Sequence, residues 1–347
     1  MSEIFGHPWL GSFFGDAASA EIWSGERQMV HMLAFEAAWS RALGACGRVS
    51  PDVAERAAAA AESWTPDVAA IRDGVALDGV PVPALTHALR EAAGSAEGGV
   101  HRGATSQDVM DSALALTLKD MSVLLGQRLR ELDAALAGLA DRFGDTGIMG
   151  RTRMQAAIPI RAGHRIAAWA QPFSRHRARL ADLRPRVEIV QVGGVVGDRQ
   201  QLEPDAETMA RHVADALGLA SGPCWHTARD GIAEYGGLLS MIAGSCGKIG
   251  TDICLMAQQG ISEIALPGGG ASSGMPHKRN PVDAELLITL SGYAATQLPA
   301  LHHALRHEQE RSGSAWALEW MVLPGLAQAS ARALAVATRL AESATPA

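Results

Sequence analysis

The segment 267–281 holds the side chains with the clearest capacity for chemistry. It contains four glycines and three prolines, which predicts a loop, because glycine frees the backbone and proline interrupts helices. The same loop carries the hydroxyls of Ser272 and Ser273, the ammonium of Lys278 and the amide of Asn280. A mobile loop that presents a proton carrier beside positive charge is typical of an active-site lid. A surface loop with a chance mixture of serine and lysine is the alternative.

Two further polar segments interrupt the helical pattern. Residues 101–108 read His-Arg-Gly-Ala-Thr-Ser-Gln-Asp, and residues 150–155 read Gly-Arg-Thr-Arg-Met-Gln. Either Thr105 or Ser106 can cap the helix that follows, and Asp108 would lie in its first turn, where the helix dipole favours a negative charge. We therefore expect the first segment to lie at the start of a helix.

That helix is predicted to be unusually long. From residue 110 to 143, apolar residues recur at steps of three or four without a break. A helix over 106–143 would be more than about 50 Å long at about 1.5 Å per residue, so it must pack against helices of similar length. Residues 230–260 repeat the pattern with five glycines between 236 and 250, which predicts a central helix that its neighbours approach closely in an oligomeric bundle.

The remaining segments complete an all-α prediction, because strand-like alternation is nearly absent. We expect helices over about 26–45, 81–99, 161–183, 282–310 and 315–343. A further helix is expected to begin after Ser50, which would be its N-cap. The arginines of 161–183 are expected on a solvated face. We divide the chain into an N-terminal helical domain (1–100), a central long-helix bundle (101–312) and a short C-terminal helical segment (313–347).

Composition excludes several classes of protein. The net charge of −7 argues against nucleic-acid binding but permits a local pocket of positive charge. The four cysteines have no metal-type spacing, and the glycine-rich stretch 191–199 lacks a phosphate-binding fingerprint, so we expect neither metal nor cofactor. We identify no leader peptide and no apolar run of membrane-spanning length. We therefore expect a cytoplasmic protein with free thiols and no membrane partner.

The three polar segments resemble the shared regions of the fumarase/aspartase superfamily. Residues 272–281, Ser-Ser-Gly-Met-Pro-His-Lys-Arg-Asn-Pro, match its signature S-S-x-M-P-x-K-x-N-P, and the other two segments precede it in the same order. Within the superfamily, the Thr-Ser-Gln-Asp form of the first region, Trp-His-Thr-Ala-Arg-Asp at 225–230 and His-Glu-Gln-Glu-Arg-Ser-Gly at 307–313 are similar to the branch of bacterial 3-carboxy-cis,cis-muconate cycloisomerases.

The resemblance implies an elongated helical bundle whose C-terminal domain is reduced or absent, and a homotetramer whose sites are shared between subunits. It implies a reaction in which a proton next to a carboxylate is moved while a group on the neighbouring carbon adds or departs. In this branch a muconate is lactonised during the catabolism of aromatic acids such as protocatechuate. The catalytic residues would be Ser273 and Lys278. The substrate, a small polycarboxylate, would be bound by His101, Thr105, Ser106, Arg153, Gln155, His226, Arg229 and Asn280.

One position departs from the superfamily pattern. Where the second region usually has a histidine, a candidate general acid, this chain has Arg153. A guanidinium cannot release a proton near neutral pH, so a general acid is replaced by a fixed cation. Amines and hydroxide leave poorly without protonation, whereas a carboxylate, whose conjugate acid has a pKa of about 4, leaves unaided. An arginine at this position therefore favours a lactonising enzyme. Arg153 would bind one of the substrate's carboxylates, or a sulfonate in place of that carboxylate.

Three alternatives stay open at this stage. An adenylosuccinate lyase or another fumarate-releasing lyase is disfavoured by Arg153. The segment 270–274 fits the G-x-S-x-G elbow of serine hydrolases, but that motif needs a preceding strand and an immediately following helix. A structural oligomer that kept the fold without the chemistry is disfavoured by the joint presence of Ser273, Lys278 and Asn280.

Overall fold

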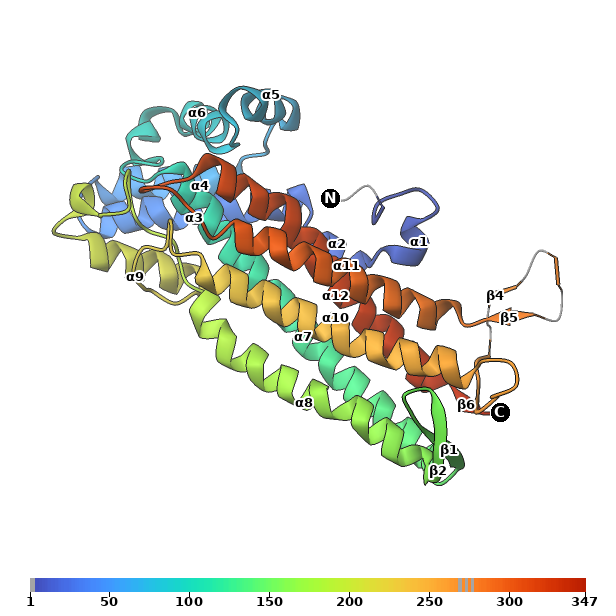
Figure 1. Cartoon of the computed structure of the whole chain (residues 1–347). Coiled ribbons are helices and arrows are strands. Elements are labelled where there is room, and N and C mark those ends of the chain that lie inside the picture. The colour runs from blue at the N-terminus through green and yellow to red at the C-terminus, as the bar shows by residue number, and fades with distance from the viewer. Residues whose placement is uncertain (1–3, 268–269, 272–273, 276–277) are drawn as a thin grey trace.

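Helix α7, Ser106–Phe143, is the axis of the molecule (Figure 1). The computed structural model describes residues 4–267, 270–271, 274–275 and 278–347. Thr105 is the N-cap of α7, and its backbone N–H donates to Oδ2 of Asp108 at 3.0 Å. The predicted bounds of this helix are confirmed. From Leu118 onward its apolar stripe is fully buried, at Leu118, Met121, Leu125, Leu129, Leu132, Leu136 and Leu139.

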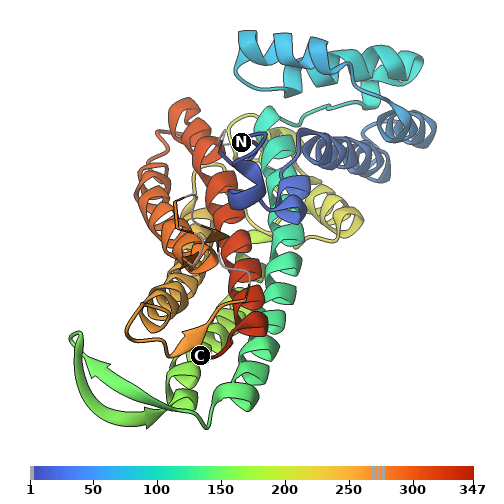
Figure 2. The ribbon, with the colours of Figure 1, turned by 90° about the vertical axis from the view of Figure 1, so that its right-hand side faces the viewer.

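Four more long helices form the bundle with α7 (Figures 1 and 2). They are α8 (Ala162–Val187), α10 (Asp230–Met256), α11 (Val282–His303) and α12 (Gly313–Ser343). The all-α bundle predicted from the sequence is confirmed. The domain division expected from the sequence places residues 313–347 outside the bundle. In the structure, α12 instead packs lengthwise against α7, α10 and α11 and shares their hydrophobic core.

The N-terminal helices cover the end of the bundle at which α7 begins (Figure 1). Ser50 is the N-cap of α4 as predicted, with its Oγ accepting from the Val53 N–H at 3.3 Å. This layer and the short helices around it comprise α1 (Gly11–Phe14), α2 (Ala17–Ile22), α3 (Gly25–Ala45), α4 (Pro51–Ser63), α5 (Val68–Asp78), α6 (Val82–Ala93), η1 (Gly94–Gly99), η2 (Gln200–Leu202) and α9 (Ala206–Leu217).

Strands occur where none was predicted. β1 (Gly147–Thr152) and β2 (Gln155–Arg161) form an antiparallel hairpin that extends away from the bundle (Figure 2). Both of its faces are largely exposed, so no alternation of apolar and polar residues marks it in the sequence. Two short pairs join β3 (Ile264–Ala265) to β6 (Thr345–Pro346) and β4 (Gly270–Ala271) to β5 (Arg279–Asn280).

The helix predicted over 282–310 ends earlier. α11 stops at His303, and residues 304–312 form a connection to α12. Within that connection, Arg311 donates from Nε to Oε1 of Gln107 at 2.9 Å and from Nη2 to the carbonyl of Val195 at 3.0 Å. These contacts to distant segments favour a loop over the helical continuation that local propensity predicts.

The glycines of α10 divide between two faces. A Cβ on Gly250 would lie 2.5 Å from the carbonyl oxygen of Ala284, and one on Gly247 would lie 2.5 Å from Cβ of Ser291, so α11 approaches as closely as predicted. Gly237 and Gly244 instead face open space. By length and composition α10 could span a membrane. However, half of its most apolar 18 residues are buried against the rest of this chain, as in the core helix of a helical bundle.

Gly250→Ala is expected to lower the free energy of unfolding by about 1–3 kcal/mol, because the added methyl group meets backbone and Cβ atoms of α11 that cannot move independently. Urea unfolding measures the loss. Gly292→Ala on α11 is the matched control, since nothing lies within 4 Å of its added Cβ, and it should be neutral or stabilising by up to about 1 kcal/mol. Equal losses in both variants would contradict close packing at Gly250.

Candidate active site

His101 is oriented by a buried carboxylate. Its Nδ1 lies 2.6 Å from Oε1 of Glu36, whose side chain is fully buried on α3. The backbone of His101 has a φ of 56°, an unusual conformation for a non-glycine residue that turns the chain toward α7. With Nδ1 engaged, Nε2 is the ring nitrogen available to a ligand. No motif in the sequence marks Glu36 as part of a site.

Asp108 ties three segments together beneath the start of α7. Its carboxylate accepts hydrogen bonds from the backbone N–H of Gly193 at 2.7 Å, of Gly194 at 3.0 Å and of Thr105 at 3.0 Å. Oδ1 also lies 3.1 Å from Nε2 of His226. The partly buried hydroxyl-bearing residues at 105 and 106 are therefore presented from a rigid base.

His226 is 3% exposed and so lies behind this base. Burial alone would lower its pKa, but hydrogen bonds with Asp108 and the neighbouring Cys224 outweigh burial and raise the pKa to about 9. The imidazolium is thus the form expected at neutral pH. Within this chain the partner of His226 is Asp108. The sequence predicts that His226 binds substrate, but from this position it would act on the substrate indirectly, through the segments that Asp108 holds.

The raised pKa predicts a pH dependence of stability. A histidine with a raised pKa stabilises the folded state fully below its unfolded pKa of about 6.5, and this contribution is lost as pH rises toward about 9. The difference in unfolding free energy between the wild type and His226→Gln should therefore shrink by about 1–3 kcal/mol between pH 6 and pH 9.5. Urea unfolding at the two pH values checks it, and a difference that stays constant would contradict the Asp108 pairing.

Arg229 lies at the centre of a buried ionic cluster. Its guanidinium donates to both oxygens of Asp111, at 2.7 and 3.1 Å, and to both oxygens of Glu319, at 2.9 and 2.5 Å. It also lies over the ring of Trp225, 4.6 Å from the centroid. Burial opposes its charge, but the two carboxylates raise the pKa of Arg229 well above its usual value. Its donors are directed at carboxylates of its own chain, so here it joins α7, α10 and α12.

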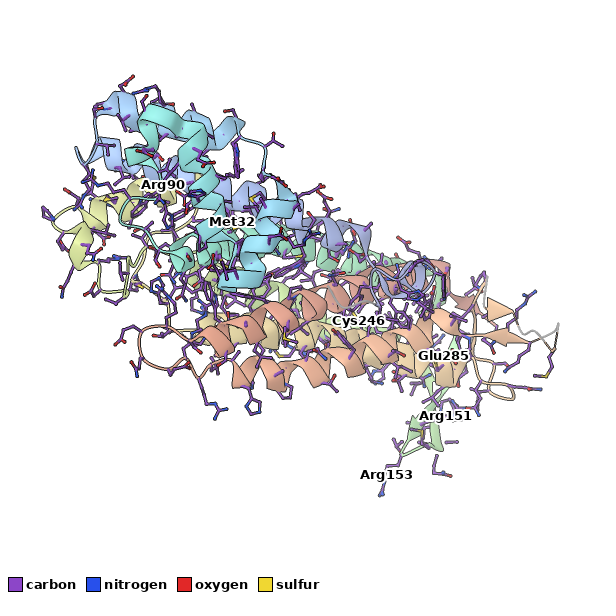
Figure 3. All side chains as sticks on the ribbon, turned by 90° about the horizontal axis from the view of Figure 1, so that it is seen from above. Met32, Arg90, Arg151, Arg153, Cys246 and Glu285 are labelled. Carbon is purple, nitrogen blue, oxygen red and sulfur yellow. The ribbon has the colours of Figure 1, made fainter. Side chains whose placement is uncertain are left out.

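The hairpin presents Arg153 at its tip. Thr152 pairs with Gln155, which leaves Arg153 and Met154 as a two-residue turn with φ values of 50° and 68°. The side chain of Arg153 extends away from the bundle (Figure 3) and, among the described residues, makes no ion pair or side-chain hydrogen bond. Gln155 is exposed on the adjoining strand. Two strained non-glycine residues at a tip suggest that the side chains are retained for function.

The loop over residues 267–281, called the signature loop below, lies between β3 and α11. Gly270 pairs with Asn280 and Ala271 with Arg279, so the loop begins and ends as a narrow hairpin. Lys278 is exposed and its backbone N–H donates to the carbonyl of Met275 at 3.0 Å. Ser273, the predicted proton carrier, lies outside the described residues.

The candidate residues gather at two ends of the chain rather than at one site. Residues 101–106 lie where α7 begins, and the hairpin follows where α7 ends, so at about 1.5 Å per residue over 38 residues the two are separated by more than about 50 Å. The strands β4 and β5 of the signature loop lie at the same end as the hairpin (Figure 1). One copy of the chain therefore does not bring the three motifs together.

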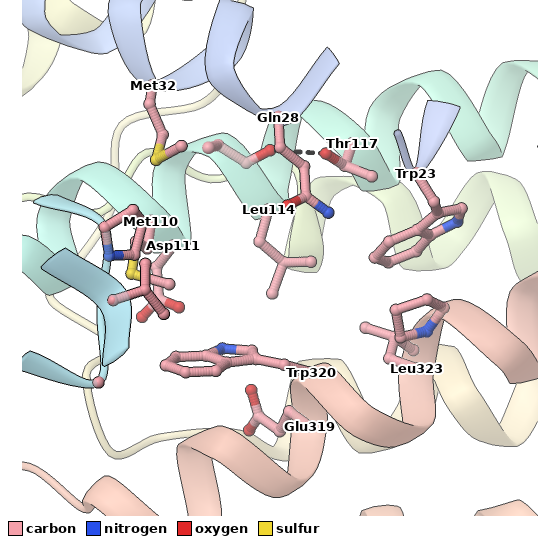
Figure 4. Close-up of a pocket in the computed structure, with 15 residues that line it drawn as sticks. Trp23, Gln28, Met32, Met110, Asp111, Leu114, Thr117, Glu319, Trp320 and Leu323 are labelled. Atoms are coloured by element: carbon pink, nitrogen blue, oxygen red, sulfur yellow. Dashed lines mark hydrogen bonds between the residues drawn. The ribbon is translucent and has the colours of Figure 1, made fainter. Parts of the chain in front are cut away.

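Two cavities flank these ends. The first, about 580 Å³, lies between the hairpin, α8 and the end of α10 and is lined by the cations Arg151, Arg153, Arg165 and Lys248. The second, about 240 Å³, lies at the start of α7 (Figure 4) and has a largely apolar wall. Its charged lining residues, Asp111 and Glu319, are carboxylates already bound to Arg229, so it does not suit a polyanion. The apolar wall includes Trp23, Met32, Met110, Leu114, Trp320 and Leu323.

Comparisons with known proteins agree with this architecture. Residues 13–295 match a family model described as lyase. The chain is 39% identical to a 3-carboxy-cis,cis-muconate cycloisomerase of Pseudomonas aeruginosa, over 99% of this chain and 76% of that protein. It is 33% identical to an N-acetyl-S-(2-succino)cysteine lyase of Enterococcus italicus, over 91% of this chain and 70% of that protein.

Among solved structures, a 3-carboxy-cis,cis-muconate lactonizing enzyme from Pseudomonas putida superposes with a TM-score of 0.92 at 36% identity, covering 100% of this chain and 78% of that one. A fumarate lyase from Mesorhizobium sp. BNC1 gives a TM-score of 0.90 at 31% identity, covering 96% and 76%. With a signature loop, a capped first region and a family match that together span most of its length, the chain belongs to the lyase family of the fumarase/aspartase superfamily.

Proposed function

We propose that this protein is a cycloisomerase that converts 3-carboxy-cis,cis-muconate into 4-carboxymuconolactone. Relatives with this name share 34–39% identity with the chain, and a solved lactonizing enzyme shares its fold. The observation that carries the proposal is Arg153, an exposed cation without a partner among the described residues, at a position where a general acid would serve a lyase that releases an amine.

The chemistry follows from a carboxylate acting as both nucleophile and leaving group. In the lactonising direction a muconate carboxylate oxygen forms a bond to one carbon of a double bond. The electron pair of that double bond moves to the adjacent carbon, which takes a proton from the Ser273 hydroxyl. In the reverse direction Ser273 removes that proton and the carboxylate departs without protonation. Lys278, Asn280 and Arg153 would stabilise the negative charge that builds up on the substrate carboxylates.

The other polar residues would complete the pocket. We assign His101, through Nε2, together with Thr105 and Ser106, to the wall opposite the signature loop, and Gln155 to substrate orientation beside Arg153. His226 and Arg229 would act through the segments that they hold. The site requires no cofactor in this scheme.

An absorbance assay tests the activity. Purified protein should remove the ultraviolet band of the conjugated diene of 3-carboxymuconate, and Ser273→Ala should lower kcat by at least about 10²-fold, as for loss of a general acid or base.

A second activity follows from the leaving group. A thiolate, whose conjugate acid has a pKa of about 8.5, also departs with little need for protonation by a general acid. Release of fumarate from N-acetyl-S-(2-succino)cysteine is therefore the second activity to assay. An unchanged diene band would overturn the proposal.

We further propose a cytoplasmic homotetramer in which each site draws on several subunits. Two features support it: the motifs lie at opposite ends of α7, and α10 presents Gly237, Gly244 and the exposed Met241 and Leu255 on a face without a neighbour among the described residues. The expected mass by light scattering is four times 36.3 kDa. Mixed oligomers of inactive Thr105→Val and Arg153→Ala subunits should recover part of the activity, and a monomer or a failure to recover any would contradict shared sites.

A further inference from the structure

The β1–β2 hairpin requires an anchor. An isolated two-stranded hairpin is at best marginally stable in water, and both faces of this one are largely exposed. It nevertheless carries Arg153 and Gln155, whose positions must be defined to within a fraction of an ångström if they are to bind a substrate. The contacts that orient the hairpin are therefore part of the site.

Ile148, which is buried in the core of the bundle, anchors the base of the hairpin, and Glu263 makes the polar contacts that hold β1 above it. Its Oε1 accepts from Nη1 of Arg151 at 2.5 Å and from the backbone N–H of Met149 at 3.2 Å, both in β1. Its Oε2 accepts from Nη1 of Arg165 at 3.0 Å, on α8. Arg165 in turn donates from Nη2 to the carbonyl of Met149 at 3.1 Å, as does Nη1 of Arg151. One carboxylate thus joins the hairpin to the bundle by way of two guanidinium groups.

The environment keeps this carboxylate charged. The Glu263 side chain is only 10% exposed, and burial would raise its pKa, but the hydrogen bonds from Arg151, Arg165 and Met149 outweigh burial and hold the pKa below its usual value. The contacts of Glu263 with the hairpin and with Arg165, called the clamp below, reach β1 at Met149. This residue lies next to the register shift between Met149 and Arg151. A bulge redirects a strand, so this is where a contact controls the direction in which the tip points.

The same residue stands at the start of the signature segment. Glu263 immediately precedes β3, and the loop follows from residue 267. Arg151 and Arg165 also line the 580 Å³ cavity beside Arg153. Arg151 and Arg165 share the carboxylate of Glu263, which holds both guanidinium groups in place. Arg153 at the tip has no such partner among the described residues, so it is the hairpin cation placed to meet a substrate carboxylate.

We propose that Glu263 is a positioning residue: by holding Met149, Arg151 and Arg165 it sets the orientation of the hairpin and so places Arg153 against the substrate. This inference rests on the proposed function, in which Arg153 binds a carboxylate.

Glu263→Gln tests the proposal, because glutamine keeps the shape but removes the charge and points an amide N–H₂ at a guanidinium. The expected result is a 10- to 100-fold fall in kcat/KM for the muconate, as for a misplaced binding group. Glu234→Gln is the control: Glu234 also accepts from an arginine of α8, Arg186, at 2.9 and 2.5 Å, but it does so from α10 and toward the other end of α8. It should keep kcat/KM within about twofold. Equal effects of the two substitutions would overturn the proposal.

A double-substitution cycle separates positioning from general loss of stability. If Glu263 acts through Arg153, then Glu263→Gln should have little further effect on kcat/KM in an Arg153→Ala background. If the two effects multiply, Glu263 does not act through Arg153, and the inference fails.

Hydrogen exchange gives a readout that does not depend on the substrate. Amides of residues 147–161 should exchange at least about tenfold faster in Glu263→Gln than in the wild type or in Glu234→Gln, whereas amides in the middle of α7 should be unchanged. An inactive wild type would remove the proposed function and leave this result standing. Unchanged exchange in the hairpin would remove the clamp, whatever the activity.

Discussion

Arg229→Met is expected to lower the free energy of unfolding by about 3–5 kcal/mol. The substitution leaves the carboxylates of Asp111 and Glu319, which are 1% and 2% exposed, facing each other without their cation. A buried pair is not strongly stabilising in itself, because desolvation offsets its attraction, but removal of one partner exposes the whole desolvation cost of the other. Urea unfolding at neutral pH measures the change.

Arg339→Met is the matched control for this prediction. Arg339 also donates to both oxygens of one carboxylate, Asp283 at 2.9 and 2.8 Å, but its side chain is 47% exposed. Surface pairs of this kind contribute about 0–1 kcal/mol. In Arg229→Met/Glu319→Leu, one of the two uncompensated charges is gone, and the loss should be smaller than in Arg229→Met alone. A loss at Arg229 no larger than that at Arg339 would show that water reaches the cluster.

The long helices could be predicted because their pattern is local. The stripe along α7 has a step of three or four residues, and Thr105 followed by Asp108 marks its start, so both the type and the bounds of the element were available. The early end of α11 was not predictable in this way, since it depends on Arg311 meeting Gln107 and Val195, which lie far away in the sequence.

The site was only partly predictable for the same reason. The signature loop and Arg153 stand out by residue type and order, whereas Glu36, Asp111 and Glu263 act through partners separated by more than sixty residues. Asp111 offered one signal, a charge inside the buried part of an apolar helix, which requires a cation nearby. The hairpin offered none, because most of its residues on both faces are exposed and only Ile148 is buried.

The turn at the tip of the hairpin gives the second large prediction, in which stability and activity should change in opposite directions. A two-residue turn with positive φ at both positions is favoured by Asn-Gly, but this chain has Arg153 and Met154 there. Arg153→Asn/Met154→Gly should therefore stabilise the hairpin, by up to about 1–2 kcal/mol for relief of left-handed strain. Unfolding in urea measures that gain, or hydrogen exchange of the hairpin amides if it is local.

The same double variant should lower kcat/KM by about 10²- to 10³-fold, because it removes a cation that we propose pairs with a desolvated substrate carboxylate. Met154→Gly alone is the control: it relieves part of the strain and keeps the guanidinium, so its activity should stay within a few-fold of wild type. If both variants were equally active, the strain at Arg153 would serve no binding role, and the preference for a lactone over an amine-releasing reaction would lose its physical basis. If both were equally inactive, the conformation of the turn rather than the charge of Arg153 would be what the reaction needs.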